Sequence, residues 1–177
     1  MAMLECVPLD EYLQRIGAKS RNMVRKANRE YYYRRIKFNE WTHDIETVAR
    51  SSPARQGMPM QGWYTQAVVP TRPAALCGLH SDEWYLGLRR ADHSPVAFAH
   101  VEVLNELAIL NSILGVRAAG AAVNGLIAHL VEHVGAKWIN YLYPEGKTPS
   151  LGEFKRRVGF RPMVVSSSIA PAAGITA

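Results

Sequence analysis

The fold is decided by one junction, which reads Ile113-Leu114-Gly115-Val116-Arg117-Ala118-Ala119-Gly120-Ala121-Ala122. An apolar, strand-like run leads directly into a turn of small residues around Arg117, and a helical pattern follows. The first N–H groups of a helix have no partner within the helix, and the helix dipole adds partial positive charge there. Small side chains let an anion approach this backbone, and an arginine adds a charged donor. The junction therefore predicts a strand, an anion-binding turn and a helix.

The segments around this junction alternate between strand and helix patterns. Before it, short turns separate strand-like runs and predict an antiparallel meander over residues 83–89, 96–103 and 107–114. After it, a helix ends at Gly135, and strand, helix and strand patterns follow over residues 138–143, 150–158 and 160–167. The N-terminal part predicts two short helices within 8–33, with Ser20 as the second N-cap, then a strand over 32–38 and a helix over 42–49. This order predicts an α/β (α+β) fold with one mixed, mainly antiparallel sheet flanked by helices.

Length and composition set the class of protein. The 177 residues fit one domain over 1–177, and we expect 1–7 and 170–177 to be frayed. Hydrophobic residues at 48% and charged residues at 20% exclude disordered and collagen-like classes. No apolar run is long enough to span a bilayer, so we expect no membrane partner. Only two cysteines are present, which suits a reducing cytoplasm.

Positive charge is concentrated in one part of the chain. The formal net charge is +6, and the stretch Lys19–Lys37 alone carries +7. Three of its arginines, Arg21, Arg25 and Arg29, are four residues apart and share one face of the predicted helix. Such a block attracts nucleic acid or another polyanion, and the alternative is a solvated basic face without a partner.

The junction resembles the acyl-CoA pyrophosphate loop of the GNAT acyltransferase family. Its residues Arg117-x-x-Gly120-x-Ala122 match the family pattern Gln/Arg-x-x-Gly-x-Gly/Ala. Family members place this loop between the fourth strand of a meander and a long helix, and strand, helix and strand follow, as they do here. A tightly packed helix entry without a ligand is the alternative. The resemblance implies that an acyl-CoA co-substrate is bound by Leu114, Val116, Arg117, Ala119, Gly120 and Ala122.

The closing segment is more similar to one branch of this family. Residues Phe154-Lys155-x-x-x-Gly159 resemble the Fem-like branch, which includes aminoacyl-tRNA-dependent peptidoglycan transferases. Residues 20–27 resemble a Fem-like helix as well. The resemblance covers about residues 8–165, and it corresponds to one GNAT unit where Fem proteins have two. Fem-like proteins lack a clear pyrophosphate loop, so the loop present here favours acyl-CoA over aminoacyl-tRNA as the donor.

Acyl transfer to an amine needs a base, an oxyanion donor and an acid for the leaving group. Glu102 and His100 lie two apart on one predicted strand, so they share a face; we expect Glu102 to be the base and His100 to contact the acceptor. A hydrogen-bonded core histidine is the alternative for His100. Many GNAT enzymes use a tyrosine of the last helix as acid, and the resemblance places Lys155 there. An exposed basic residue is the alternative for Lys155, and Tyr143 is a second candidate acid.

The acceptor is expected to contact the irregular segment 51–60. Within it, Arg55 and Gln56 can bind a carboxylate or phosphate, and a loop plugged by methionines is the alternative. His129 and His133 have a spacing that suits a metal on a helix face, but no third ligand is evident, so we expect no metal.

Three functions remain open from the sequence. The first is transfer of an acyl group, such as acetyl from acetyl-CoA, directly to a small or macromolecular amine by a GNAT-type N-acyltransferase. The second keeps the fold and acts with or on nucleic acid, as an aminoacyl-tRNA-dependent transferase or a modifier of DNA or RNA bases. The third is a catalytically inactive binding module. The resemblance also allows a homodimer.

Overall fold

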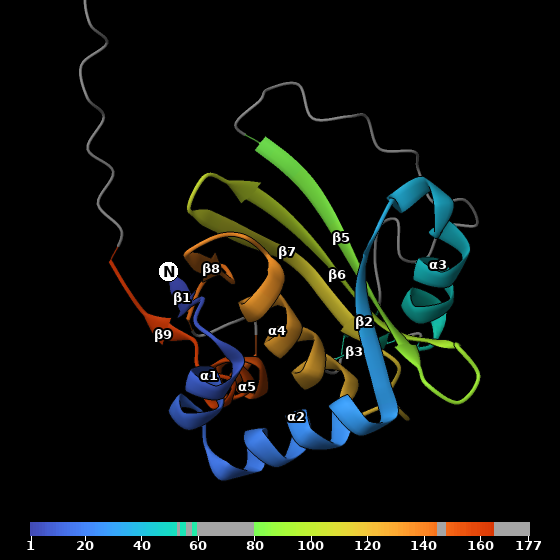
Figure 1. The fold of residues 1–177 in the computed structure, drawn as a ribbon, viewed down its shortest axis with the longest axis horizontal. Coiled ribbons are helices and arrows are strands. Elements are labelled where there is room, and N and C mark those ends of the chain that lie inside the picture. Colours follow the sequence, from blue (N-terminus) through green and yellow to red (C-terminus); the bar gives the residue numbers. More distant parts are fainter. Residues whose placement is uncertain (53, 56–57, 60–79, 145–147, 165–177) are drawn as a thin grey trace, which may run out of the picture.

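The computed structural model describes residues 1–52, 54–55, 58–59, 80–144 and 148–164. A seven-stranded sheet with the order β2-β5-β6-β7-β8-β1-β9 forms its centre (Figure 1). Its neighbouring strands are antiparallel except for β7 and β8, which are parallel. The strands are β1 (Ala2–Glu5), β2 (Tyr31–Ile36), β5 (His80–Arg89), β6 (Pro95–Leu104), β7 (Leu107–Gly115), β8 (Trp138–Asn140) and β9 (Arg161–Pro162). The mixed, mainly antiparallel sheet predicted from the sequence is confirmed.

Helices cover both faces of this sheet. On one face α4 packs against β5, β6 and β7, and α1 and α2 pack against α4. On the other face α3 packs against β6 and β7 (Figure 1). The helices are α1 (Leu9–Arg15), α2 (Ala18–Glu30), α3 (Thr42–Arg50), α4 (Ala122–His133) and α5 (Pro149–Arg157). A 3₁₀ turn, Phe38–Glu40, precedes α3, and a small hairpin of β3 (Ala54–Arg55) and β4 (Met58–Pro59) follows it.

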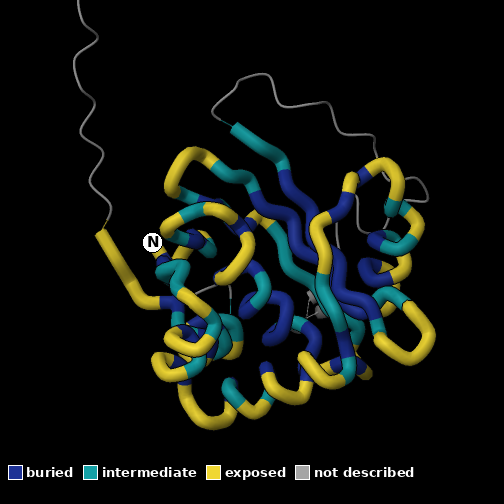
Figure 2. Tube along the Cα trace, in the orientation of Figure 1, coloured by how far each residue is buried: buried dark blue, intermediate teal, exposed yellow. Residues whose placement is uncertain are grey.

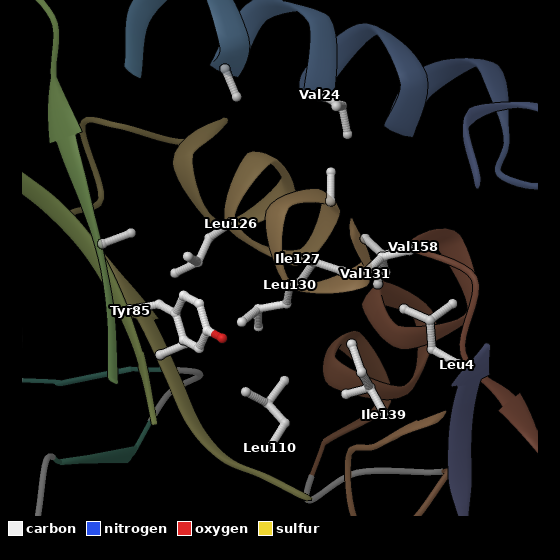
Figure 3. Close-up of a cluster of buried hydrophobic side chains, with 14 of the residues drawn as sticks. Leu4, Val24, Tyr85, Leu110, Leu126, Ile127, Leu130, Val131, Ile139 and Val158 are labelled. Carbon is white, nitrogen blue, oxygen red and sulfur yellow. The ribbon is translucent and has the colours of Figure 1, made fainter. Parts of the chain in front are cut away.

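Alternation along the central strands builds two separate cores. Successive side chains of a strand point to opposite faces, so neighbours such as Trp84 and Tyr85 belong to different cores. Tyr85 and Leu110 pack with Leu126 and Leu130 of α4 (Figure 3). The α3-facing core contains Trp84, Leu86, Phe98, Ile45 and Val48. Figure 2 shows that buried residues concentrate in the central strands, while the outer side of α2 is exposed.

The N-terminal residues are the main correction to the predicted fold. Residues 1–7 were expected to be frayed, but Ala2–Glu5 form β1 between β8 and β9. Leu4 is 6% exposed and belongs to the α4-facing core. A run of four residues is too short to show a periodic pattern, so β1 is recognisable only from its tertiary partners. Residues 170–177 lie outside the part of the chain that the structure describes.

Element boundaries differ in smaller ways. The strand expected over 138–143 ends at Asn140, because Leu142 adopts a positive φ of 53°. The last strand is limited to Arg161–Pro162, followed by coil as far as residue 164. Ser20 is not an N-cap, since α2 begins at Ala18 after Gly17. Gly135 does follow α4 with φ of +70°, the left-handed conformation that glycine allows at a helix end.

Candidate active site

A cavity lies where two parallel strands separate. β7 and β8 pair only from Leu107 to Ile109, opposite Trp138 to Asn140, and the rest of β7 has no partner on that side among the described strands. Here a cavity of about 790 Å³ lies between the end of β7, the N-terminus of α4, the start of α2, and α5. Ligands of α/β proteins favour such places, where strands diverge beside a helix N-terminus.

The junction residues form one wall of this cavity. Leu114, Arg117 and Gly120 line it, and Arg117 and Gly120 are exposed. No side chain caps the start of α4. A Cβ added at Gly120 would meet no atom within 4 Å, so the backbone there borders open space. This geometry suits a ligand that approaches the backbone closely, as the sequence predicts for an anion.

Three other residues expected at the cofactor do not line the cavity. Ala119 and Ala122 are 1% and 0% exposed and belong to the α4-facing core. Val116 packs against both cores, and its N–H donates to the carbonyl of Val96 at 2.8 Å. Their side chains therefore belong to the packing of the fold, and their role as ligand contacts through the backbone stays a prediction. They pack the turn between β7 and α4, because alternate residues of so tight a turn face the core.

The cavity lining is cationic. Its charged side chains are Lys19 of α2, Arg117 of the junction and Arg157 of α5, and no carboxylate residue is among the described lining residues. Met23, Phe154 and other apolar side chains complete the wall. A concave site with an apolar wall and only positively charged side chains attracts anionic ligands that also have an apolar or uncharged part.

Lys155 lies beneath this cavity. It is 2% exposed, so the alternative of an exposed basic residue is wrong. Its Nζ donates to the carbonyl oxygens of Tyr141 at 2.6 Å and Tyr143 at 2.7 Å, and it lies 4.2 Å from the centre of the Tyr141 ring. Tyr141 lines the cavity, whereas Lys155 does not. The amine therefore holds the chain after β8 and borders the cavity through Tyr141.

The other candidate catalytic residues lie elsewhere. Tyr143 is 75% exposed and does not line the cavity. Glu102 and His100 share a face of β6, as expected, but they do not line the cavity either. That face is the one covered by α3, because His100 stacks on Trp84 of the α3-facing core. The sequence placed these residues around one cleft. In the structure Glu102 and His100 lie together on the α3-facing side of the sheet and Tyr143 is exposed, because the sequence alone does not fix which side of the sheet a strand face occupies.

The expected acceptor segment is described only in part. The structure describes only the backbone of Arg55, which belongs to β3, and Gln56 lies outside the described residues. Ser52 and Ala54, which precede them, line the cavity. The segment after α3 thus reaches the cavity, while the two expected contacts stay predictions.

The basic face of α2 begins at the cavity. Lys19 lines it, and Arg25, Lys26 and Arg29 are exposed along the same helix. Arg21 differs, since its Nη1 donates to the carbonyls of Ile16 at 2.7 Å and Leu13 at 3.3 Å and caps the end of α1. The predicted cationic face therefore remains, with Lys19 and Lys26 in place of Arg21.

Sequence reasoning missed several features of the site. The strand β7 carries a bulge, because His100 pairs with Ser112 while Val101 pairs with Leu110, which leaves Asn111 as an extra residue. Bulges bend a strand and are frequent next to active sites. Arg157 was also missed; it lies in α5, 40 residues from Arg117, and only the fold brings the two together. No local pattern signals either feature.

The pair His129 and His133 does not form a metal site with a third ligand among the described residues. Their rings stack with centroids 4.2 Å apart, and the Nδ1 of His133 lies 3.0 Å from the carbonyl oxygen of His129. Burial lowers the pKa of His129 to about 4, and the charge of His133 acts in the same direction. His129 is therefore neutral at pH 7 and serves as a packing residue beside Tyr33 and Tyr85.

Comparisons with known proteins bear on the fold. No protein-family model matches the sequence, and no curated protein matches it. The structure matches the C-terminal domain (DUF2156) of an Agrobacterium fabrum protein assigned as a lysylphosphatidylglycerol synthetase, with a TM-score of 0.55 and 12% identity over 90% of this chain and 56% of that one. It also matches FemX, with a TM-score of 0.62 and 10% identity over 90% of this chain and 58% of that one.

This chain thus spans somewhat more than half the length of each of these structures. At such low identity the likeness concerns the fold. No described helix has the length and apolar character needed to cross a membrane. The strand order, the divergence of β7 from β8 and both structural matches show that the chain has a GNAT-like fold of the kind found in FemX.

Proposed function

We propose that the protein is an acyltransferase that takes an aminoacyl group from aminoacyl-tRNA and transfers it to an amine. The observation that carries this proposal is the cationic cavity at the divergence of β7 and β8, from which the exposed basic face of α2 extends. Lys19 belongs to both surfaces. A tRNA bound along α2 would neutralise Arg25, Lys26 and Arg29 and place its acylated end in the cavity.

The comparisons favour this donor over acyl-CoA. The chain resembles the Fem-like branch in its Phe154-Lys155-x-x-x-Gly159 segment, and FemX shares its fold. The matching domain from Agrobacterium fabrum belongs to a protein whose name denotes an aminoacylated product, lysylphosphatidylglycerol. All three point to aminoacyl transfer within the broader GNAT-like class.

The transfer itself requires few catalytic groups. The acceptor amine attacks the ester carbonyl of the aminoacyl-tRNA, a C–N bond forms, and the C–O bond to the ribose breaks. The amine loses one proton and the ribose oxygen gains one. Arg117, Arg157 and Lys19 would hold the phosphates of the donor, and backbone N–H groups near Leu114 are the expected donors to the oxyanion.

Lys155 would act as a positioning residue in this reaction. Its two hydrogen bonds fix the backbone of Tyr141, whose side chain lines the cavity. Binding then orients the reacting groups, and proximity supplies much of the rate enhancement.

The test measures the binding of a labelled aminoacyl-tRNA with a non-hydrolysable amide link, by fluorescence anisotropy at low and high salt. We expect binding that weakens steeply with salt and that Arg117→Glu weakens about tenfold or more. The matched control is Lys137→Glu, which reverses an exposed charge before β8 that does not line the cavity. Equal effects of both variants would show general charge attraction and would contradict the proposed site.

A second donor, acyl-CoA, is favoured by the junction itself. Arg117 and the open space beside Gly120 lie at the start of α4, where the resemblance expects the pyrophosphate. Isothermal titration with acetyl-CoA distinguishes the two donors. Micromolar binding of acetyl-CoA that Arg117→Glu abolishes, together with no tRNA binding, would replace the first proposal by this one. Binding of neither donor would leave the inactive binding module.

A further inference from the structure

Three acid and imidazole side chains converge on the sheet face that α3 covers, away from the cavity. Asp82 of β5 lies directly opposite Glu102 of β6, and His100 is two residues from Glu102 on the same face. One ligand atom from each of these three residues lies within 4.8 Å of the others. Neither Asp82 nor His100 lines the cationic cavity.

His100 is held in a fixed orientation within this cluster. It is 4% exposed, and its ring stacks on Trp84 with centroids 4.5 Å apart and an interplanar angle of 10°. Its Nε2 forms a hydrogen bond with the carboxylate of Asp82, and the Nε1 of Trp84 donates to the same carboxylate at 3.4 Å. A buried imidazole that is bonded to one carboxylate and has a second carboxylate nearby is a preorganised set of donors.

Two further polar atoms on this face lack partners. The Nε2 of His80 and the Oγ of Ser112 are buried and form no hydrogen bond with any described residue. His80 precedes Asp82 by two residues on β5, and Ser112 pairs with His100 across β6 and β7, so both share the face of the cluster. Buried polar atoms are nearly always satisfied, by protein or by a bound water or ion.

The two carboxylates lie close together with little positive charge beside them among the described residues. Carboxylates directly opposite each other on neighbouring strands repel. Within the described chain, no lysine or arginine forms an ion pair with Asp82 or Glu102; the one partner is His100. The nearby cation Arg35 pairs instead with Glu83, which points to the opposite face of β5.

We infer that Asp82, His100 and Glu102 bind a divalent transition-metal cation. One imidazole and two carboxylates form a donor set that suits Zn²⁺ and its first-row neighbours, whereas Mg²⁺ and Ca²⁺ favour oxygen ligands alone. Metal–ligand bonds of about 2.0–2.2 Å bring ligand atoms to within roughly 4.3 Å of each other, so the 4.8 Å cluster needs only small side-chain adjustments. The cation would replace the hydrogen bond between His100 and Asp82.

The site differs from the histidine pair considered from the sequence, and no metal was expected there. Its ligands come from two strands, and Asp82 and His100 are 18 positions apart in the sequence. Three protein ligands leave at least one position for water or for His80, as in sites that are not purely structural. This inference is independent of the proposed transferase function.

The test uses untagged protein that has been stripped with a chelator and dialysed. Co²⁺ is titrated while the visible absorption band of the bound ion is followed, and Zn²⁺ is then used to displace it. We expect about one Co²⁺ per chain, with affinity lowered more than about tenfold in Glu102→Gln and Asp82→Asn, because changes even to residues behind a ligand cost roughly 10–100-fold. Added Zn²⁺ should raise the melting temperature of the wild type but not of Glu102→Gln.

Two control variants make the result specific. Glu106→Gln neutralises an exposed carboxylate in the turn between β6 and β7, and His133→Gln removes an exposed imidazole of α4; both should bind Co²⁺ as the wild type does. Circular dichroism of the metal-free variants shows whether each is folded. No binding by the wild type would overturn the inference and leave His100 as a proton-sharing partner of the carboxylates. Binding that survives both Glu102→Gln and Asp82→Asn would also overturn it.

Discussion

Lys155 shows how one side chain connects a helix to the end of a strand. The amine is buried, and it donates to two carbonyls that no longer belong to β8. Carbonyl oxygens at the end of a strand need a donor when they are withdrawn from water. A lysine provides three N–H groups from one atom, so a single side chain can serve both carbonyls. This arrangement explains why a basic residue is buried at the base of a cationic cavity.

The variant Lys155→Met tests this role. Methionine keeps the length and apolar stem of the side chain but removes the N–H groups that donate to the carbonyl oxygens of Tyr141 and Tyr143. We expect the free energy of unfolding to fall by about 2 kcal/mol, as for the loss of hydrogen bonds from a charged group. Urea denaturation measures it, with Lys137→Met as an exposed control. Unchanged or increased stability would show that the cost of burying the amine cancels its hydrogen bonds.

At the scale of elements, local sequence patterns predicted the helices and strands themselves far better than the contacts between them. The meander and α4 were predictable because period-two and helical patterns extend over nine or more residues in each. The side of the sheet on which a residue lies was not predictable. It depends on strand register, as the bulge opposite His100 and the pairing of Asp82 with Glu102 show. The junction residues Leu114, Arg117 and Gly120 therefore line the cavity as the local pattern indicates, and the shared face of His100 and Glu102 was also predictable; which side of the sheet that face occupies was not.

The contact between α2 and α4 gives a prediction at this scale. A Cβ on Gly125 of α4 would lie 2.6 Å from the Cβ of Ala27 and 2.2 Å from the hydroxyl oxygen of Tyr33. We expect Gly125→Ala to lower the free energy of unfolding by about 1–2 kcal/mol, because crowding at the contact outweighs the better helix propensity of alanine.

Thermal or urea unfolding measures this effect against Gly120→Ala, where a Cβ meets no atom within 4 Å. The control should change stability by less than about 0.5 kcal/mol. Placing Gly125→Ala in a Tyr33→Phe background removes the hydroxyl and should recover part of the loss. A stabilising Gly125→Ala would mean that α2 and α4 pack less closely than the structure shows.

At the scale of the whole molecule, the sheet consists of two parts with a narrow connection. β2, β5, β6 and β7 form one part with long pairings, while β8, β1 and β9 form a smaller part. Three residue pairs between β7 and β8 join them, and the cavity lies where this pairing stops. The smaller part depends on β1, since β8 and β9 both pair with it.

Truncating one core side chain of β1 tests that dependence. We expect Leu4→Ala to lower the free energy of unfolding by about 3 kcal/mol, the usual cost of removing a buried leucine side chain. Leu104→Ala is the control, because Leu104 is 40% exposed at the end of β6. Differential scanning calorimetry compares the two. Equal, small effects would mean that residues 1–7 are frayed after all.

The position of β1 has a consequence for how the chain is made. Met1 and Asn140 are in contact although they are 139 positions apart in the sequence, and β1 also pairs with β9. At 5–20 residues per second, a ribosome needs roughly 7–28 s to add the intervening segment. During that time β1 has neither β8 nor β9 to pair with, and long-range pairing of this kind slows folding. Completion of the sheet therefore waits for the synthesis of residues 138–162, which leaves the apolar side chains of β1 without their partner strands in the nascent chain.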